Sequence, residues 1–295
     1  MNIAIAALGF GIVTAAILSL GAVGFTLQYG VTNVLNLAIA GVMSGAEYVS
    51  LEINRHGANI WLTIAVGAVF GAVASYALNR FIYMPFIRRG VRAFAMVIIS
   101  LAVWTIIQYV VLAIVGPGYS SLRVPVTHTY SLGAIRITGT QISVVLIAIV
   151  ALLALEATLR FTLFGKAIRA TATNAPLARA SGVNVGRVID LTWLISGVFS
   201  GIAGVVIAIT VSSFSYSTAG DFLVPLIAAA ILGGVGRPLG AMVGALIVGV
   251  VSEVGAALTN PSYKNVIAFA MLGIVLVVRP SGLFPERVQR KDVVL

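Results

Sequence analysis

The stretch MNIAIAALGFGIVTAAILSLGAVGFTL, residues 1–27, decides the fold class, because it has no charged side chain and is long enough to cross a lipid bilayer. It lacks the basic region that opens a cleaved signal peptide, and its apolar run exceeds a signal core in length. We therefore expect a first membrane-spanning helix here.

The composition of the whole chain agrees with this reading. Of the 295 residues, 60% are hydrophobic and only 9% are charged, and the mean hydropathy is +1.10. A soluble domain carries about 25% charged residues, so this chain has too little polar surface to face water on all sides. The absence of cysteine excludes disulfides and thiolate chemistry.

Apolar segments recur along the rest of the chain, and lipid requires each of them to be helical because it satisfies no backbone groups. The sequence predicts an all-α polytopic membrane protein with eight or nine transmembrane helices, one or two of them broken or re-entrant, in one domain over 1–295. The segments lie at about 33–51, 60–79, 93–115, 141–158, 189–212, 221–235, 240–258 and 266–279.

The basic residues give the expected orientation. Nine crossings place all but four of the 18 Lys and Arg residues on one side, and the four are Arg55, Arg123, Arg136 and Lys264. Lys and Arg near spans stay in the cytoplasm, which puts the C-terminus there and Met1 outside. If 33–51 enters and leaves on one side, eight crossings remain and Met1 is cytoplasmic. The net charge of +10 thus encodes topology and gives no reason to expect a nucleic-acid partner.

Two polar loops are long enough to have structure of their own. The outer loop 116–140 is rich in Gly, Pro and β-branched residues, which predicts a short hairpin or lid. The inner loop 159–188 predicts two short amphipathic helices, with Asn174 as N-cap and Pro176 in the first turn of the second helix. Gly182 fits the stop of that helix.

Catalytic and nucleotide-binding motifs are missing. The pair Gly165-Lys166 is followed by Ala167 and lacks the upstream glycine of a phosphate-binding loop. The histidines His56 and His128 are far apart, and neither an HExxH motif nor a Gly-x-Ser-x-Gly elbow occurs. We expect no catalytic residue, no metal site and no cofactor in this chain, and hence a protein that is not an enzyme.

Charged residues inside membrane spans are costly and usually paired or functional. Glu156 lies four residues before Arg160, and Asp190 lies one turn after Arg187, so we expect a helix-surface pair in each case. Asp221 precedes an apolar run, where a carboxylate suits a helix N-terminus.

Glu47 and Glu253 are harder to assign. Both fall towards the outer half of their predicted spans, where they could meet each other or a cationic group of a ligand. The alternative is that each is buried and hydrogen-bonded to neighbouring Ser, Tyr or backbone groups.

Breaks in the apolar pattern, together with Glu47 and Glu253, mark a candidate translocation path. The segment 221–240 contains Gly233-Gly234 between two prolines, and broken helices commonly line such paths. Asn33 and Asn36 bring two amides to the start of the second span. Glycines four residues apart permit close helix crossings and occur at Gly67/Gly71, Gly197/Gly201 and Gly236/Gly240/Gly244.

Four stretches together resemble the membrane subunit of bacterial branched-chain amino-acid (Liv-type) ABC importers, over nearly the whole chain. They are Gln28-Tyr29-Gly30 through Asn36-Leu37-Ala38; Gly165-Lys166-Ala167-Ile168-Arg169-Ala170 with Asn174, Ala178 and Gly182-Val183-Asn184; Gly233-Gly234-Val235-Gly236 through Gly240, Gly244 and Glu253; and Arg279-Pro280-Ser281-Gly282-Leu283-Phe284.

The resemblance implies partners in the bacterial inner membrane and on both sides of it: a second permease as homo- or heterodimer, cytoplasmic ABC ATPases that hold ATP and Mg, and a periplasmic substrate-binding protein. The family's ATPase-coupling loop maps onto 165–188, with the candidate residues Gly165, Lys166, Arg169, Asn174, Ala178, Arg179 and Gly182. Arg123 and Arg136 in the outer loop are candidates for docking the binding protein.

One departure concerns the substrate. Family members commonly read Asn-(Phe/Leu)-Ala-His-Gly after the first span, but here Ile39-Ala40 stands in place of the His-Gly. If this region touches the substrate, the cargo need not be leucine, isoleucine or valine, and urea, short amides and other small polar solutes stay open. We expect import of branched-chain or other neutral amino acids or amides by alternating access. The alternative is a stand-alone ion-coupled transporter or channel that uses Glu47 and Glu253.

Overall fold

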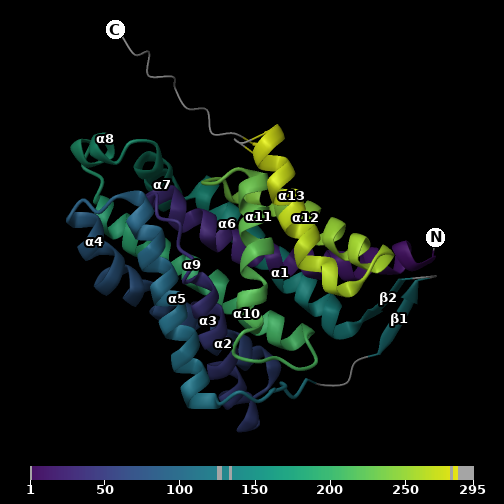
Figure 1. Ribbon diagram of the computed structural model, residues 1–295. Coiled ribbons are helices and arrows are strands. Elements are labelled where there is room, and N and C mark those ends of the chain that lie inside the picture. The colour runs from purple at the N-terminus through teal and green to yellow at the C-terminus, as the bar shows by residue number, and fades with distance from the viewer. Residues whose placement is uncertain (1, 125–127, 133–134, 280–281, 285–295) are drawn as a thin grey trace.

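The protein is a bundle of helices, described by a computed structural model for residues 2–124, 128–132, 135–279 and 282–284 (Figure 1). Seven of the described helices are long and apolar enough to cross a membrane. The long helices are α1 (Asn2–Thr32), α3 (Ile60–Ala77) with its extension, α5 (Ala93–Val115), α6 (Gly139–Phe161), α9 (Val185–Thr210), α12 (Pro238–Leu258), and α13 (Lys264–Val278) with the 3₁₀ turn η2 (Pro261–Tyr263).

Shorter elements complete the bundle. The extension of α3 is a π-helical turn, η1 (Leu78–Tyr83), followed by α4 (Met84–Arg88). The other short helices are α2 (Ile39–Arg55), α7 (Leu163–Thr173), α8 (Ala175–Ala180), α10 (Thr218–Asp221) and α11 (Leu223–Gly233). The predicted all-α polytopic fold is therefore confirmed, and each predicted apolar segment contains a helix.

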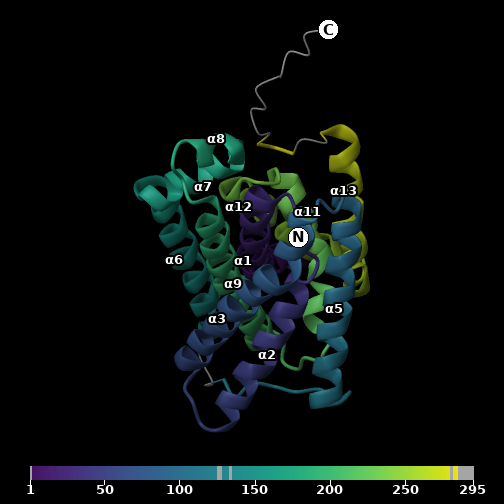
Figure 2. The ribbon, with the colours of Figure 1, turned by 90° about the vertical axis from the view of Figure 1, so that its left-hand side faces the viewer.

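A two-stranded hairpin confirms the expectation for the outer loop. Strands β1 (Thr129–Leu132) and β2 (Ile135–Thr138) are antiparallel, with Thr129 opposite Thr138. Thr138 then begins α6 with a capping box, in which its hydroxyl accepts from the Gln141 amide and the Gln141 side chain accepts from the Thr138 amide. Since α6 starts at the hairpin and ends beside α7, it joins the two ends of the bundle, which we call the hairpin end and the α7–α8 end (Figures 1 and 2).

The direction of α2 bears on the number of crossings. The start of α1 lies beside β2 in Figure 1, so α1 runs from the hairpin end towards the α7–α8 end. Near the end of α2, the side-chain amide of Asn54 donates to the Arg123 carbonyl. The backbone amide of Arg123 donates in turn to Asn54 Oδ1 at 2.7 Å. Arg123 belongs to the loop that carries the hairpin, so α2 returns to the hairpin end. α2 has 17 residues and is not among the seven described helices long enough to cross a membrane, so the choice between eight and nine crossings stays a prediction.

The core of the bundle lies around α1 and α9, the most enclosed of the long helices. Glycine allows the backbones of α3 and α9 to approach closely. A Cβ on Gly71 of α3 would overlap the backbone of Gly197 and Gly201 of α9. The two glycine pairs predicted to mediate close packing therefore form one α3–α9 crossing. In the third predicted set, Gly240 and Gly244 pack against α11, whereas Gly236 has a φ of 90° and forms part of a turn.

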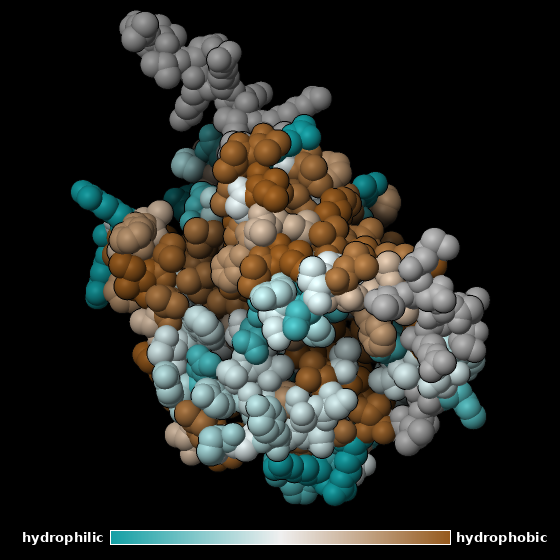
Figure 3. Space-filling view, turned by 45° about the vertical axis from the view of Figure 1, so that its right-hand side comes forward, coloured by the Kyte–Doolittle hydropathy of each residue, from teal (hydrophilic) through white to brown (hydrophobic). Residues whose placement is uncertain are grey.

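The outer surface of the long helices is hydrophobic, as expected for a face in contact with lipid tails. Figure 3 shows hydrophobic side chains over much of one face, with hydrophilic side chains gathered along its lower margin. Large exposed apolar residues on α5 include Phe94 and Ile114, and α13 contributes Val277. α5 and α13 are also among the least buried of the long helices.

Candidate functional site

The α7–α8 end carries two short helices outside the main bundle (Figure 2). Side-chain caps define them: Thr162 accepts from the Gly165 amide, Asn174 from the Leu177 amide at 3.0 Å, and Asn184 from the Arg187 amide at the start of α9. Pro176 lies in the first turn of α8, and Gly182 follows it with a φ of 86°. The predicted pair of short helices is confirmed, with Asn174, Pro176 and Gly182 in their predicted places. The caps Thr162 and Asn184 were not predicted.

The predicted coupling residues divide into packed and exposed groups. Gly165 is buried, and a Cβ there would overlap the backbone of Leu159; Ala178 is buried as well. Arg169 donates to the Leu159 carbonyl, which ties α7 to the end of α6. The exposed members are Lys166, Arg169, Asn174, Arg179 and Gly182. Leu177, which sequence reasoning did not select, is a large apolar side chain that is 63% exposed.

A buried polar cluster lies where α1 ends and the chain crosses to α2. Asn36 is its centre: its amide nitrogen donates to Gln28 Oε1 at 2.7 Å, and its oxygen accepts from Tyr83 Oη at 2.6 Å and from the Ala38 amide at 3.0 Å. Gln28 in turn donates to Ser75 Oγ at 2.9 Å. These groups satisfy the polar atoms of an irregular segment within the bundle.

The other predicted amide has a different role. Asn33 is exposed and has a φ of 52°, and its amide donates to the Tyr29 carbonyl at 2.7 Å. A left-handed residue just after a helix is a common stop signal, and asparagine tolerates this conformation. Asn33 therefore ends α1, and a role for it in a translocation path stays a prediction.

The π-helical turn η1 brings two further side chains into this region. Tyr83 packs its ring against Trp193 of α9, with centroids 5.0 Å apart, and both residues are fully buried. Asn79 donates to Asp190 Oδ1 at 2.9 Å. The prediction that Asp190 pairs with Arg187 is wrong, because the inserted residue of the π turn aims Asn79 at it. Glu156 and Arg160 do form the predicted pair.

Gly233 and Gly234 lie at the turn between α11 and α12. A Cβ on Gly233 would overlap the backbone of Gly240, and Gly234 has a φ of 101°. The C-terminal segment returns to this turn, where the Leu283 amide donates to the Leu232 carbonyl at 2.7 Å. These glycines allow close packing and a tight turn, and their predicted part in a translocation path stays untested.

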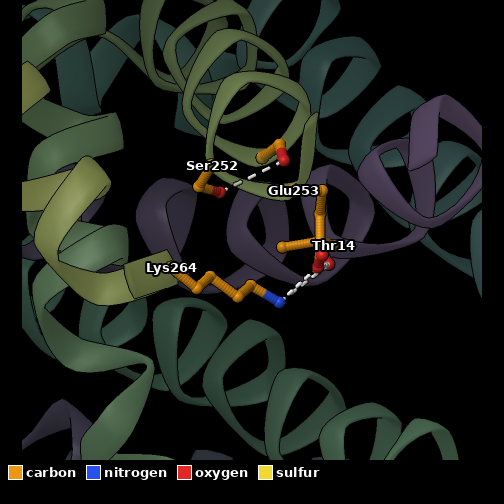
Figure 4. A network of polar contacts seen from close by, with 5 residues as sticks. Thr14, Ser252, Glu253 and Lys264 are labelled. Carbon is orange, nitrogen blue, oxygen red and sulfur yellow. Dashed lines mark hydrogen bonds and ion pairs between the residues drawn. The ribbon is translucent and has the colours of Figure 1, made fainter. Parts of the chain in front are cut away.

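Glu253 lies on α12 in a small polar cluster (Figure 4). Its carboxylate accepts from the Thr14 hydroxyl of α1 and forms an ion pair with Lys264 at the start of α13. The Lys264 ammonium also lies 5.9 Å from the centre of the Phe222 ring. Beside this cluster is a hollow of about 300 Å³, lined by side chains from α1, α10, α11, α12 and α13.

Glu47 is in a different environment on α2, which packs against α3, α5 and α9. Its side chain is fully buried, and neither carboxylate oxygen has a hydrogen-bond partner among the described residues. The hydroxyl of the adjacent Tyr48 is likewise buried without a described partner. Within the described residues, Glu47 and Glu253 do not form the contact that the sequence suggested.

The outer-loop arginines are only partly described. Arg123 is exposed, and Asn54 fixes its backbone through the two hydrogen bonds given above. Arg136 pairs with Ser131 in the hairpin, but its side chain lies outside the described part of the chain. Some basic residues of the predicted cytoplasmic set also lie outside the described residues: Arg287, Arg290 and Lys291.

Comparison with known proteins gives, along most of the chain, the same family that the sequence resembles. The family model described as branched-chain amino acid transport system / permease component matches residues 7–276. The high-affinity branched-chain amino acid permease LivH of Escherichia coli K12 is 30% identical, over 92% of each chain. BraD of Pseudomonas aeruginosa is 24% identical over 92% of this chain and 93% of its own.

A more distant relative is named for another substrate. The ribose import permease RbsC of Escherichia coli K12 is 26% identical over 87% of this chain and 79% of its own. No solved structure matches the chain.

Proposed function

Because this chain belongs to the family of branched-chain amino acid ABC transport permeases, we propose that it is the membrane-spanning subunit of an importer. It carries branched-chain or other neutral amino acids or amides into the cytoplasm. The ATP is hydrolysed by separate ATPase subunits, which hold the nucleotide and Mg, and this chain contributes no ATP site. A second permease subunit, identical or different, completes the pore.

The observation that carries this proposal is the pair of capped helices α7 and α8. They project from one end of the bundle and combine an exposed apolar side chain, Leu177, with the exposed cations Lys166 and Arg179. Such a surface suits a groove of mixed apolar and acidic character on a soluble partner. We infer that this partner is the ATPase, and that residues 165–188 transmit its motion to the bundle.

The same surface supports a proposed orientation. The α7–α8 end carries Lys166, Arg169 and Arg179, and cytoplasmic loops are the ones enriched in Lys and Arg. The hairpin end then faces the outside, where a substrate-binding protein delivers its cargo. Alternating access opens the bundle first towards this side and then towards the cytoplasm. In a bacterial cell this corresponds to the inner membrane, with the C-terminus in the cytoplasm.

The test is assembly with the ATPase. Leu177→Glu places a charge in the proposed interface, and we expect the complex isolated from native membranes to lose its ATPase subunits. Ala178 is a poorer site for this test, since its side chain packs inside the chain. Tyr119→Glu, at an exposed position in the hairpin-end loop, is the matched control and should leave assembly intact. Full recovery of ATPase with Leu177→Glu would contradict the proposed interface.

A second candidate is the stand-alone ion-coupled transporter. The observation that favours it is Glu47, whose buried carboxylate has no hydrogen-bond partner among the described residues. Glu253 supports it less, because Lys264 and Thr14 already hold its carboxylate. Uptake by this chain alone that an ionophore abolishes, and that Glu47→Gln also abolishes, would favour this candidate over the importer.

A further inference from the structure

The hollow beside Glu253 has the size of a small-molecule site. Its volume of about 300 Å³ lies at the lower end of the range for ligand pockets. Three apolar side chains from different elements line it: Leu18 of α1, Phe222 between α10 and α11, and Pro225 of α11. The hollow therefore offers an apolar wall that can bury an aliphatic side chain.

Two opposite charges line the same hollow. Asp221 ends α10 and has an exposed carboxylate with no hydrogen bond or ion pair to another described residue. Lys264 lies at the start of α13. An ammonium group has three donors, and Glu253 and Thr14 occupy two of the directions around Lys264. One donor of Lys264 is left for a ligand, with Ser262 and Asn265 beside it in the lining.

Glu253 and Thr14 have a clear structural part in this arrangement. Together they hold the Lys264 side chain across from α1, and Phe222 adds a cation–π contact at 5.9 Å. Lys264 is thereby fixed at the edge of the hollow and does not extend freely into the surroundings. Positioned donors of this kind bind carboxylates more tightly than mobile ones.

From this geometry we propose that the hollow is a binding subsite for a neutral α-amino acid in its zwitterionic form. The substrate carboxylate binds the free donor of Lys264, its ammonium binds Asp221, and its aliphatic side chain packs against Leu18, Phe222 and Pro225. This inference rests on the proposed function, and it selects α-amino acids over amides, which have no charge for either residue to recognise.

The experiment measures substrate binding to the assembled transporter in lipid nanodiscs, without any binding protein. The probe is radiolabelled leucine, with 4-methylpentanoate as the analogue without the ammonium and 3-methylbutylamine as the analogue without the carboxylate. We expect Asp221→Asn to weaken leucine binding about tenfold, because a charge-assisted hydrogen bond is lost. Binding of 4-methylpentanoate should stay unchanged in this variant.

A second variant tests the other end of the ligand. Lys264→Gln should weaken binding of leucine and of 4-methylpentanoate, and leave 3-methylbutylamine unaffected. The thermal unfolding midpoint of Lys264→Gln shows whether this variant has a folding defect. Asp221→Asn tests the hollow without a risk of that kind, because the Asp221 carboxylate has no partner among the described residues. Glu52→Gln, an exposed acid on α2 at the hairpin end, is the matched control and should change nothing.

The outcomes separate the subsite from the function. If wild-type transporter shows ATP-driven leucine uptake and Asp221→Asn has unchanged leucine affinity and KM, the subsite is refuted and the importer stands. If wild-type transporter shows no ATP-driven uptake but binds leucine in an Asp221-dependent way, the subsite stands and the importer is refuted. An equal loss of affinity for all three ligands in Asp221→Asn would also overturn the proposed subsite.

Discussion

At the scale of single residues, Asn36 shows how a broken segment is tolerated inside a membrane protein. Its amide reaches Gln28 and its oxygen reaches Tyr83 and the Ala38 backbone, so three separate elements are joined at one side chain. In surroundings without water, each of these groups would otherwise be unsatisfied. The irregular stretch 33–38 therefore depends on side chains instead of a regular backbone ladder.

Tyr83→Phe tests this dependence. The substitution removes the hydroxyl that donates to Asn36 but keeps the ring against Trp193. We expect the free energy of unfolding to fall by about 1 kcal/mol, the net value of a typical buried hydrogen bond. The measurement is thermal or denaturant unfolding of the purified chain in detergent. Tyr109→Phe, at a position that is 60% exposed, is the control and should leave stability unchanged; equal stability of both variants would refute the role of the hydroxyl.

The sequence could identify Asn36 but not its partners. Two amides in an apolar context mark a break, and that signal is local. Tyr83 is separated from Asn36 by 47 positions and faces it only because η1 inserts a residue into the helical turn. The same π turn directs Asn79 to Asp190, which is why the predicted pair with Arg187 does not form. The residue pattern of 78–83 does not predict a π-helical turn.

At the scale of elements, apolar length and glycine spacing carried most of the predictive information. Each apolar run contains a helix, because a segment that faces lipid has no other way to satisfy its backbone. The spacing of Gly67/Gly71 and Gly197/Gly201 marked two surfaces capable of close approach, and the structure pairs them. Spacing alone did not say which helices meet, and the similarly spaced Gly236 forms a turn.

Gly71→Ala tests the α3–α9 crossing. Alanine is a better helix former than glycine by about 1 kcal/mol, so a neutral site would gain stability. At Gly71 the new methyl group would overlap the α9 backbone, and overpacking of this kind costs about 1–3 kcal/mol. We expect a lower unfolding midpoint in detergent.

The control for this prediction is Gly273→Ala on α13. No atom lies within 4 Å of a Cβ added there, so this variant should be as stable as the wild type or slightly more stable. If both variants shift the unfolding midpoint in the same direction, the crossing does not limit the approach of the helices.

At the scale of the whole molecule, the bundle presents two different polar ends. The α7–α8 end offers capped helices with an apolar tip and cations, and the hairpin end offers loops held by Asn54 and by the β1–β2 pairing. The alternation of basic loops predicted these two ends from sequence. The path through the membrane could not be predicted in the same way, because it depends on packing among helices and, in the proposed importer, on a second permease.

Charge reversal at the hairpin end tests the proposed docking of the binding protein. We expect Arg123→Glu combined with Arg136→Glu to weaken that interaction about tenfold or more, since like charges at an interface cost several kcal/mol. The measurement is the binding-protein concentration that half-stimulates the ATPase of the reconstituted transporter, at low and high salt. Arg92→Glu, an exposed site before α5, is the control and should leave this concentration unchanged. Unaltered stimulation of the double variant by the binding protein would exclude a role for these two arginines in docking it.

The most direct test of the central claim is uptake of labelled leucine into proteoliposomes that contain this chain with its copurified partners. The account predicts uptake that requires ATP on the α7–α8 side and substrate with binding protein on the hairpin side, and that Leu177→Glu abolishes. Uptake by this chain alone, without ATP or any ATPase, would contradict the assignment as an importer subunit.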